Sequence, residues 1–271
     1  MSAILFDIGG TKIKMAFSAD NESFEAPQSV MTPNTYDEGL KLFLEMAQRC
    51  AVGRTIDKVC GGIAGPFKER ERSLIGSPNL TDWIGKPLKN DLEKNLQAPI
   101  YIENDAALVG LGEAIVGAGK DKRIIAYITV STGVGGARIV NGKIDEKAVG
   151  FEPGHQILDI ASGKTLQDLV SGKSLEIATG KHPKEIEDRE VWQKLAVELA
   201  VGIHNTLVHW SPDCLVLGGS MIVGNPCIPL DAVESHLKST LKIYPEIPPI
   251  KKAELGDFGG LHGALAYLKN Q

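Results

Sequence analysis

Ala3-Ile4-Leu5-Phe6-Asp7-Ile8-Gly9-Gly10-Thr11-Lys12 is the stretch that decides the fold of this chain. An apolar run of strand length ends in an acid, two glycines and a threonine, and a second apolar run from Ile13 to Phe17 follows at once. The pattern predicts a hairpin of two buried strands joined by a glycine-rich turn. Glycine has no Cβ, so the backbone of such a turn can pass close to a ligand, and its N–H groups suit an anion. Considered alone, the turn is more simply explained as an ordinary hairpin.

A second turn of the same kind changes that interpretation. The apolar run from Ile124 to Val130 leads into Ser131-Thr132-Gly133-Val134-Gly135-Gly136, and a return strand from Ala137 to Val140 follows. Two similar strand–turn–strand units predict two related domains with a cleft between them.

Other elements follow from local patterns. We expect a strand over residues 23–31, a helix over residues 36–51 with its apolar residues on one face, a polar loop over residues 68–85 and a strand over residues 250–255. Because strands and helical segments alternate along the chain, we expect an α/β fold. We place the small domain at residues 1–118, joined by the C-terminal helix 259–271, and the large domain at residues 119–258.

Composition narrows the class of protein. The chain has 271 residues, 43% of them hydrophobic and 23% charged, which is enough to build a substantial core. The net charge of −5 argues against a general nucleic-acid-binding protein, which needs a basic face. Four cysteines without a CxxC pair predict buried free thiols in a reducing compartment. No run approaches the roughly 20 apolar residues of a membrane span, and no signal peptide is visible, so we expect a cytoplasmic protein.

Standard nucleotide-binding loops do not explain the sequence. Residues 162–165 and 171–174 contain the Gly-Lys-Thr and Gly-Lys-Ser strings of a P-loop, but the glycine required five positions earlier is replaced by Leu158 and Gln167. Any phosphate must therefore be held by the two hairpin turns, which could clamp a triphosphate from both sides, with hydroxyls from Thr11 and Thr132. Asp7 would supply the carboxylate that Mg²⁺ takes, directly or through water, beside phosphate oxygens.

Three further places carry candidate chemistry. Asp105 lies where a strand ends and a helix begins, so it is either a helix cap or a base that takes a proton from an attacking hydroxyl. Glu152 and His155 suit the hydroxyls of a polyol better than a zinc ion, because no cysteine lies between Cys60 and Cys214. Gly218-Gly219 follows a strand and either simply ends it or lets an adenine ring lie on the backbone.

Taken together, these motifs resemble the ROK family of bacterial sugar kinases and repressors. The resemblance covers nearly the whole chain, and its motifs occur in the family's order: Asp7-Ile8-Gly9-Gly10-Thr11-Lys12, Glu103-Asn104-Asp105-Ala106, Ser131-Thr132-Gly133-Val134-Gly135-Gly136, Glu152-Pro153-Gly154-His155, Val216-Leu217-Gly218-Gly219 and Gly259-Gly260-Leu261-His262-Gly263-Ala264. It implies two actin-like ATPase domains of the ribonuclease H-like, hexokinase-like type. It also implies transfer of the γ-phosphate of Mg-ATP to a sugar hydroxyl, usually O6 of a hexose or N-acetylhexosamine.

The resemblance also assigns roles residue by residue. Asp105 matches the catalytic base. The matches to sugar contacts are Asn79, Asn104, Glu152 and His155. The matches to the nucleotide site are Gly9, Gly10, Thr11, Lys12, Thr132 and Gly133 for the phosphates and Gly218 and Gly219 for the adenosine. We also expect a homodimer.

The chain departs from the family after His155. Many members have a Cys-x-Cys and a further Cys there, which together bind a structural zinc, whereas residues 156–164 of this chain contain no cysteine. We therefore expect no zinc. Gln167 stands where a sugar-contacting Glu would be, and it is a candidate to reach the anomeric end of the sugar. This departure leaves the sugar open among the glucose, N-acetylmannosamine, N-acetylglucosamine and fructose class.

Two alternatives accompany the kinase hypothesis. The first is a sugar-binding regulator of the same family without catalysis. Family repressors carry an N-terminal helix-turn-helix segment, and the phosphate turn here begins by residue 7, so we favour the kinase. The second alternative keeps the enzyme as a glucokinase but replaces ATP by polyphosphate, and the sequence does not choose between these donors.

Overall fold

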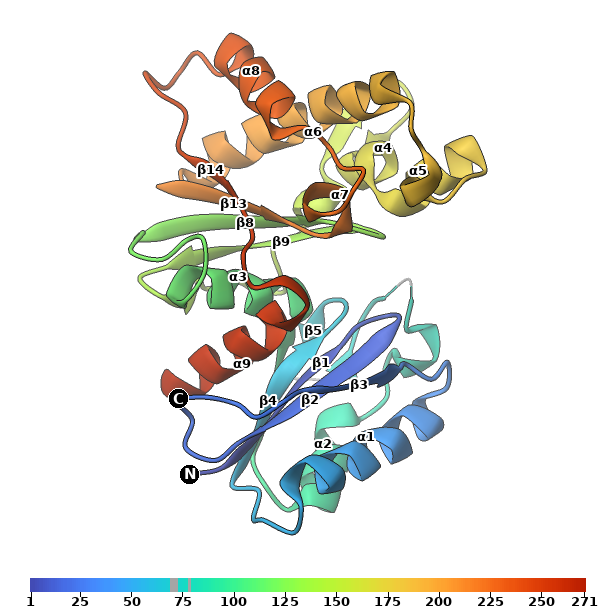
Figure 1. Cartoon of the computed structure of the whole chain (residues 1–271), viewed down its shortest axis with the longest axis vertical. Helices are drawn as coiled ribbons and strands as arrows, with labels where there is room; N and C mark the ends of the chain where they lie inside the picture. The colour runs from blue at the N-terminus through green and yellow to red at the C-terminus, as the bar shows by residue number, and fades with distance from the viewer. Residues whose placement is uncertain (69–72, 78) are drawn as a thin grey trace. The chain divides into compact units, whose positions relative to one another are not determined.

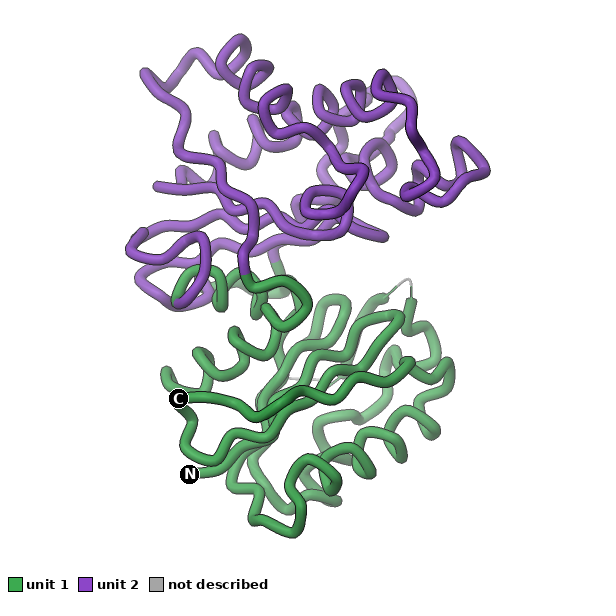
Figure 2. The backbone as a smooth tube through the Cα atoms, viewed as in Figure 1, with its two compact units in different colours: residues 1–115, 146–150, 255–271 green, residues 116–145, 151–254 purple. Residues whose placement is uncertain are grey.

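The computed structural model describes residues 1–68, 73–77 and 79–271. In this part the chain forms two compact units, drawn in green and purple in Figure 2. Unit 1 comprises Met1–Ile115, Glu146–Gly150 and Leu255–Gln271, and unit 2 comprises Val116–Asp145 and Phe151–Glu254. Residues 146–150 therefore interrupt unit 2 in sequence but belong to unit 1. No helix among the described residues combines the length and the apolar character needed to cross a membrane.

The two units contain sheets with the same topology. The first sheet has the strand order β3 (Gln28–Met31), β2 (Lys12–Ser18), β1 (Ala3–Ile8), β4 (Lys58–Ile63) and β7 (Ile100–Asn104). The second has the order β10 (Lys143–Ile144), β9 (Val134–Val140), β8 (Ile124–Val130), β13 (Cys214–Gly218) and β14 (Ile250–Lys252). In each sheet the first three strands pair antiparallel and the last three pair parallel. The mixed α/β architecture and the repeated strand–turn–strand unit predicted from the sequence are thus confirmed.

Helices cover both faces of the first sheet (Figure 1). Helices α1 (Tyr36–Ala51) and α2 (Leu88–Leu96) lie on one face, and α3 (Asp105–Ile115) and α9 (Gly259–Lys269) lie on the other. Because side chains alternate along a strand, Ile4, Phe6 and Ile8 of β1 enter the core with α1. Asp7 points the opposite way, where its carboxylate faces the backbone of Gly260 in α9. The alternation of β1 therefore places the only acid of this strand on the α3–α9 face.

Unit 2 buries its apolar side chains between its sheet and a layer of helices. These helices are α4 (Leu166–Val170), α5 (Gly172–Thr179), α6 (Arg189–Trp210), α7 (Ser220–Val223) and α8 (Leu230–Thr240). The short remaining elements are the strands β5 (Phe67–Lys68), β6 (Ser73–Leu74), β11 (Ile157–Asp159) and β12 (Lys164–Thr165) and the 3₁₀ helices η1 (Thr81–Trp83), η2 (Pro153–His155), η3 (Pro183–Glu185) and η4 (Gly256–Phe258).

Two predicted strands are shorter than expected. A third strand over residues 23–31 is predicted, but β3 begins only at Gln28. Nearby side chains bind the backbone of residue 23, so this backbone does not pair with another strand. Ser18 Oγ donates to Ser23 O at 2.6 Å, and Asp20 Oδ1 accepts from the N–H of Ser23 at 3.1 Å. Pro27 has no N–H to offer to a neighbouring strand. Similarly, β14 ends at Lys252 and not at Leu255.

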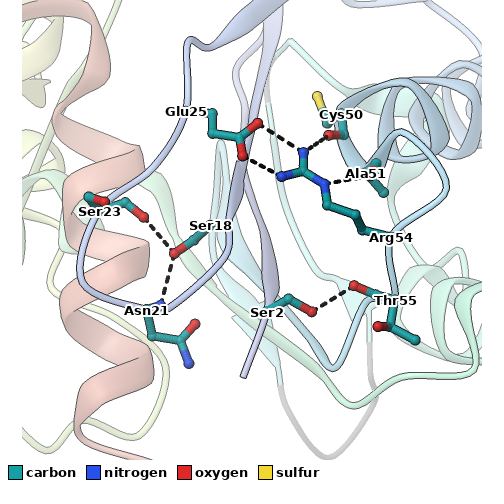
Figure 3. A network of polar contacts seen from close by, with 9 residues as sticks. All are labelled: Ser2, Ser18, Asn21, Ser23, Glu25, Cys50, Ala51, Arg54 and Thr55. Atoms are coloured by element: carbon teal, nitrogen blue, oxygen red, sulfur yellow. Dashed lines mark hydrogen bonds and ion pairs between the residues drawn. The ribbon is translucent and has the colours of Figure 1, made fainter.

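Arg54 ties three parts of unit 1 together (Figure 3). Its guanidinium donates to the last carbonyls of α1, from Nε to Ala51 O at 2.8 Å and from Nη2 to Cys50 O at 3.0 Å. It also forms a two-point ion pair with Glu25. On another side, it stacks on the Phe17 ring at 3.8 Å. Carbonyls at a helix end lack partners within the helix, so this arrangement satisfies them while it joins α1 to the sheet.

All four cysteines are free thiols, as predicted. Cys50, Cys60 and Cys214 are buried, but Cys227 is only partly buried, which corrects the expectation of a fully buried set. Burial is the main cause that raises the pKa of the three buried thiols, so these side chains behave as small apolar residues and not as nucleophiles.

Candidate functional site

The first glycine-rich turn connects β1 to β2 in unit 1, and its carbonyls are already engaged. Gly9 N–H closes the turn on Lys12 O at 3.0 Å. The carbonyl of Gly9 accepts from Thr32 Oγ1 at 2.7 Å, and that of Thr11 accepts from Thr32 N at 2.9 Å. Within the described residues, the N–H groups of Gly10 and Thr11 have no partner. The turn therefore offers free donors to an anion, as a phosphate site requires.

Asp7 lies directly before this turn and pairs with a lysine. The hairpin register sets Asp7 opposite Lys14, and Lys14 Nζ lies 3.7 Å from Asp7 Oδ2 and donates to Asp257 O at 2.7 Å. Burial raises the pKa of Asp7, and the charge of Lys14 opposes this rise. One partly buried carboxylate beside a set of free N–H donors fits a magnesium–phosphate group, because Mg²⁺ takes one or two carboxylates together with phosphate oxygens and water.

The candidate base lies on the same face of unit 1. Asp105 is the first residue of α3, and a Cβ on Gly62 of β4 would come within 2.9 Å of its Cα, so a glycine at position 62 is what lets the helix start this close to the sheet. Asn104 caps the helix: its Oδ1 accepts from Ala107 N at 3.0 Å, and its Nδ2 donates to Gly65 O at 3.2 Å. Because Asn104 performs the capping, the carboxylate of Asp105 is not needed for it. The Oδ1 atom of Asp105 accepts from the neighbouring Ala106 N at 2.8 Å.

Asn79 lies beside the first phosphate turn. A Cβ built on Gly10 would approach Asn79 Cβ to 2.4 Å and Asn79 Nδ2 to 3.0 Å. The predicted sugar-loop residue and the predicted phosphate turn are therefore in van der Waals contact within unit 1, and only a residue without a side chain fits at position 10. Residues 69–72 and 78 of the same predicted loop lie outside the described part of the chain.

The second turn, in unit 2, is held in the same manner as the first. Ser131 N–H bonds to Gly133 O at 2.8 Å, while the carbonyls of Ser131 and Thr132 accept from the N–H groups of Gly172 and Lys173 at 2.8 and 3.3 Å. These donors belong to the first turn of α5, whose N–H groups have no partners within the helix. In the part of the chain that the structure describes, the N–H groups of Thr132 and Gly133 make no hydrogen bond, so this turn also presents free donors.

Gln167 contacts the second turn. Its Oε1 accepts from Val134 N at 3.0 Å, and a Cβ on Gly133 would come within 2.6 Å of that oxygen. The acceptor atom of this side chain is thus engaged by the phosphate turn, and its contact with the anomeric end of a sugar stays a prediction. Among the described residues its Nε2 group has no hydrogen-bond partner, so its donors remain for a ligand.

Glu152 directly precedes η2 and His155 is the last residue of η2, which packs on the start of β9. A Cβ on Gly154 would approach Val134 O to 2.2 Å, and one on Gly136 would approach Pro153 Cγ to 2.7 Å, so two glycines allow this close packing. Both Glu152 and His155 keep exposed surface. The structure thus brings the predicted polyol contacts of unit 2 next to the strand that begins at the second phosphate turn.

Gln156 connects the cysteine-free segment to α6. Its Nε2 donates to Pro153 O at 2.8 Å and to Gly202 O at 3.2 Å, and its Oε1 accepts from Asn205 Nδ2 at 3.0 Å. The hairpin of β11 and β12 follows. No group of three or more His, Cys, Asp or Glu side chains that could hold a metal occurs in the described ranges. An amide side chain thus holds this segment against α6, and the absence of zinc from the protein stays a prediction.

Gly218 and Gly219 end β13 beside the second turn. Gly219 has φ +86°, and a Cβ there would lie 2.3 Å from Val130 O, so any side chain would be both strained and in collision. The next residue, Ser220, has its Oγ 3.0 Å from Ser131 Oγ. The structure therefore places the candidate adenosine glycines next to the phosphate turn of the same unit.

Sequence reasoning missed Lys14 and Thr32. A signal for Lys14 was present, because the predicted hairpin pairs residues whose numbers sum to a constant, and this pairs position 7 with position 14. No comparable signal exists for Thr32, which reaches the turn only because β3 pairs with β2. Its contacts depend on a strand whose start the sequence misplaces.

Glu152 gives a pH-dependent prediction. Although Glu152 keeps exposed surface, partial desolvation of its carboxyl raises the pKa of Glu152, and the charge of His155 acts in the opposite direction. A carboxyl whose pKa is higher in the folded chain adds stability below its unfolded pKa of about 4.3, and this stability is lost as the pH rises through the folded pKa. Glu152→Gln stays neutral, so its urea midpoint relative to the natural protein should increase between pH 4 and pH 8. Glu176→Gln, at an exposed site on α5, serves as the control, and a relative midpoint for Glu152→Gln that is constant or falls would contradict the prediction.

Comparison with known proteins identifies the family. Residues 3–271 match the model described as the ROK family. An N-acetyl-D-glucosamine kinase of Haemophilus influenzae (strain 86-028NP) is 30% identical over 300 residues, which cover 96% of this chain and 97% of that protein.

Solved structures agree with this result. The crystal structure of a ROK hexokinase from Thermus thermophilus superposes with a TM-score of 0.82 at 25% identity, covering 100% of this chain and 99% of that one. A ROK family glucokinase from Streptomyces griseus, in complex with glucose and AMPPNP, has the same fold, with a TM-score of 0.81 at 23% identity and complete coverage of both chains. Because the family model spans residues 3–271 and the fold agrees, this chain belongs to the ROK family.

Proposed function

We propose that this protein is an ATP-dependent sugar kinase, which transfers the γ-phosphate to the 6-hydroxyl of a hexose or N-acetylhexosamine. The observation that carries the proposal is the matching construction of the two glycine-rich turns, each with bound carbonyls and free N–H groups. Sugar kinases among the relatives support the same activity. The proposal requires both turns to contact the same donor during the reaction.

Asp105 takes the role of base in this proposal. Its carboxylate would accept the proton of the sugar hydroxyl as that oxygen attacks the phosphorus. The position at the start of α3 suits a carboxylate, because the N-terminal end of a helix stabilises negative charge. Phosphoryl transfer demands mainly positioning and charge stabilisation, so one base on a rigid helix is sufficient.

The phosphates of the donor would be bound by the free N–H groups of Gly10, Thr11, Thr132 and Gly133, with the hydroxyls of the two threonines. Lys12, an exposed residue at the start of β2, adds a positive charge at the first turn. Asp7 would hold Mg²⁺, through water or directly. When bound, Mg²⁺ neutralises charge on the phosphate oxygens. Gly218 and Gly219 would leave room for the adenosine.

The sugar would be recognised by Asn79, Asn104, Glu152 and His155. Both functional groups of the Asn104 amide make one contact each, and each keeps a second hydrogen-bonding position for a hydroxyl. Gln167 remains a candidate for the anomeric end through its Nε2 group. A neutral amide at this position, in place of a carboxylate, is the feature most suited to alter the choice of sugar.

A coupled assay tests the proposal directly. The purified protein is offered glucose, fructose, N-acetylglucosamine and N-acetylmannosamine, each with ATP or polyphosphate and with or without Mg²⁺. We expect magnesium-dependent transfer from ATP to at least one of the four sugars. Activity with polyphosphate alone would replace the donor, and sugar binding without transfer from either donor would favour a non-catalytic regulator. Light scattering on the same sample measures the proposed homodimer.

A further inference from the structure

Thr32 binds the first phosphate turn through two of its own groups. It follows β3 directly, and it donates its backbone N–H to Thr11 O at 2.9 Å and its hydroxyl Oγ1 to Gly9 O at 2.7 Å. The side chain is partly buried, which shields these bonds from competing water. Thr32 therefore binds two carbonyls of the turn, whose two glycines have no side chains that could fix its conformation.

Because the peptide bond is planar, a hydrogen bond that fixes a carbonyl also fixes the direction of the N–H group in the same peptide. In a trans peptide the C=O of one residue and the N–H of the next point in opposite directions. When Thr32 Oγ1 holds Gly9 O, the N–H of Gly10 must point away from Thr32. This is one of the two N–H groups that lack a partner among the described residues, so the hydroxyl of Thr32 determines which way a free donor faces.

The second unit obeys the same rule with different groups. There the carbonyls of Ser131 and Thr132 are held by N–H groups of α5, and the N–H groups opposite them in the same peptides belong to Thr132 and Gly133, which are the free donors of that turn. Two turns with unrelated supports thus share one arrangement: carbonyls tied on one side and N–H groups presented on the other. If the bonds of Thr32 served only to end β3, we would not expect a matching arrangement in the other unit.

We propose that Thr32 is a positioning residue for the phosphate donor: its hydroxyl holds the Gly9–Gly10 peptide so that Gly10 N–H faces the phosphate oxygens. The inference rests on the proposed function, and it extends that function to a residue outside the turn. The hydroxyl does not touch the donor itself. It restricts rotation of the flexible Gly9–Gly10 peptide, so that less conformational entropy is lost when the donor binds.

Two variants of Thr32 distinguish an effect of its hydroxyl from an effect on folding. Thr32→Val keeps the backbone N–H and the shape but removes the hydroxyl, and Thr32→Ser restores the hydroxyl. Calorimetry measures the affinity for AMPPNP with Mg²⁺, or for tripolyphosphate if that is the donor, and separately for the sugar. We expect Thr32→Val to weaken donor affinity by about 3- to 10-fold, the value of one hydrogen bond, with sugar affinity unchanged. Thr32→Ser should recover most of the loss. Thr35→Val, which removes an exposed hydroxyl bonded to Glu38, should change neither affinity.

Several results would overturn the inference. Donor affinity that stays the same in Thr32→Val contradicts it, and so does an equal loss of donor and sugar affinity, which indicates a purely structural role. If Thr32→Val does not fold, hydrogen exchange of the natural protein decides: the amide of Gly10 must become protected when AMPPNP or tripolyphosphate binds. If the natural protein binds neither donor, the proposed function fails instead, which distinguishes the two failures.

Discussion

Asp105→Asn is expected to lower the turnover number for sugar phosphorylation by about 10²- to 10⁴-fold, the usual contribution of a general base. The substitution keeps the shape of the side chain, but an amide cannot accept the hydroxyl proton. The fold should survive, because Asn104 and not Asp105 caps α3. The Michaelis constants of both substrates should change little, since the lost interaction belongs to the transition state. Steady-state kinetics with the best sugar from the panel measure this effect.

The matched control for this variant is Asp37→Asn. Asp37 is also in the first turn of a helix of unit 1, but it is exposed on α1, so the control has the same chemistry and a similar helix position without the candidate site. It should keep nearly full activity. Turnover of Asp105→Asn within a few-fold of the natural protein would remove Asp105 from its role, and an altered far-ultraviolet circular dichroism spectrum would indicate loss of structure instead of loss of a base.

Gly263→Ala is expected to destabilise the protein by about 3 kcal/mol, at the upper end of the usual cost of overpacking a core. A Cβ at this position of α9 would lie 1.8 Å from Leu108 O in α3. The two helices cross with backbone against backbone, because a Cβ on Gly112 would likewise lie 2.7 Å from Gly259 O. A main-chain carbonyl within a helix cannot rotate away, so the helices must separate. Since α3 begins at Asp105, displacement of this helix should also lower the catalytic activity of the variant.

Urea unfolding of this variant is compared with that of Gly76→Ala. The control adds the same methyl group to unit 1, where the nearest atom, Pro66 Cγ, would be at an ordinary 3.7 Å. It should shift the free energy of unfolding by no more than about 0.5 kcal/mol, as is usual for substitutions away from such contacts. A Gly263→Ala protein as stable as this control would show that α3 and α9 can move apart at little cost.

Local patterns predicted the elements that lie before and after each turn. Helix α1 occupies the residues 36–51 that its apolar spacing predicts, and β8 occupies the predicted residues 124–130. Helix α1 is long and periodic, so the burial of one face is enough to define it, whereas β8 is a continuous apolar run that is buried along most of its length. The predicted strand over residues 23–31 was too long because its propensity was outweighed by the local bonds of Ser18 and Asp20, which depend on loop geometry.

The candidate site could be predicted only in part, for the same reason. Asp7 is the last residue but one of β1, and Asp105 directly follows β7. A polar group at the end of a strand indicates chemistry from the sequence alone. The contact of Asn79 with Gly10 joins residues far apart in the chain, and so does the bond of Gln167 to Val134 N. No spacing rule predicts such contacts, because they arise from the packing of separate elements.

The glycine-rich turn of residues 9–11 shows which features follow from the sequence and which depend on the tertiary structure. The sequence by itself determined that a flexible turn, with N–H groups able to bind an anion, stands between two buried strands after an acid. Only the tertiary structure decided which way those N–H groups face, because glycine imposes no direction. For Gly10 N–H that direction comes from Thr32, and for the free N–H groups of the second turn it comes from the start of α5, through carbonyls held on the opposite side of the same peptide planes.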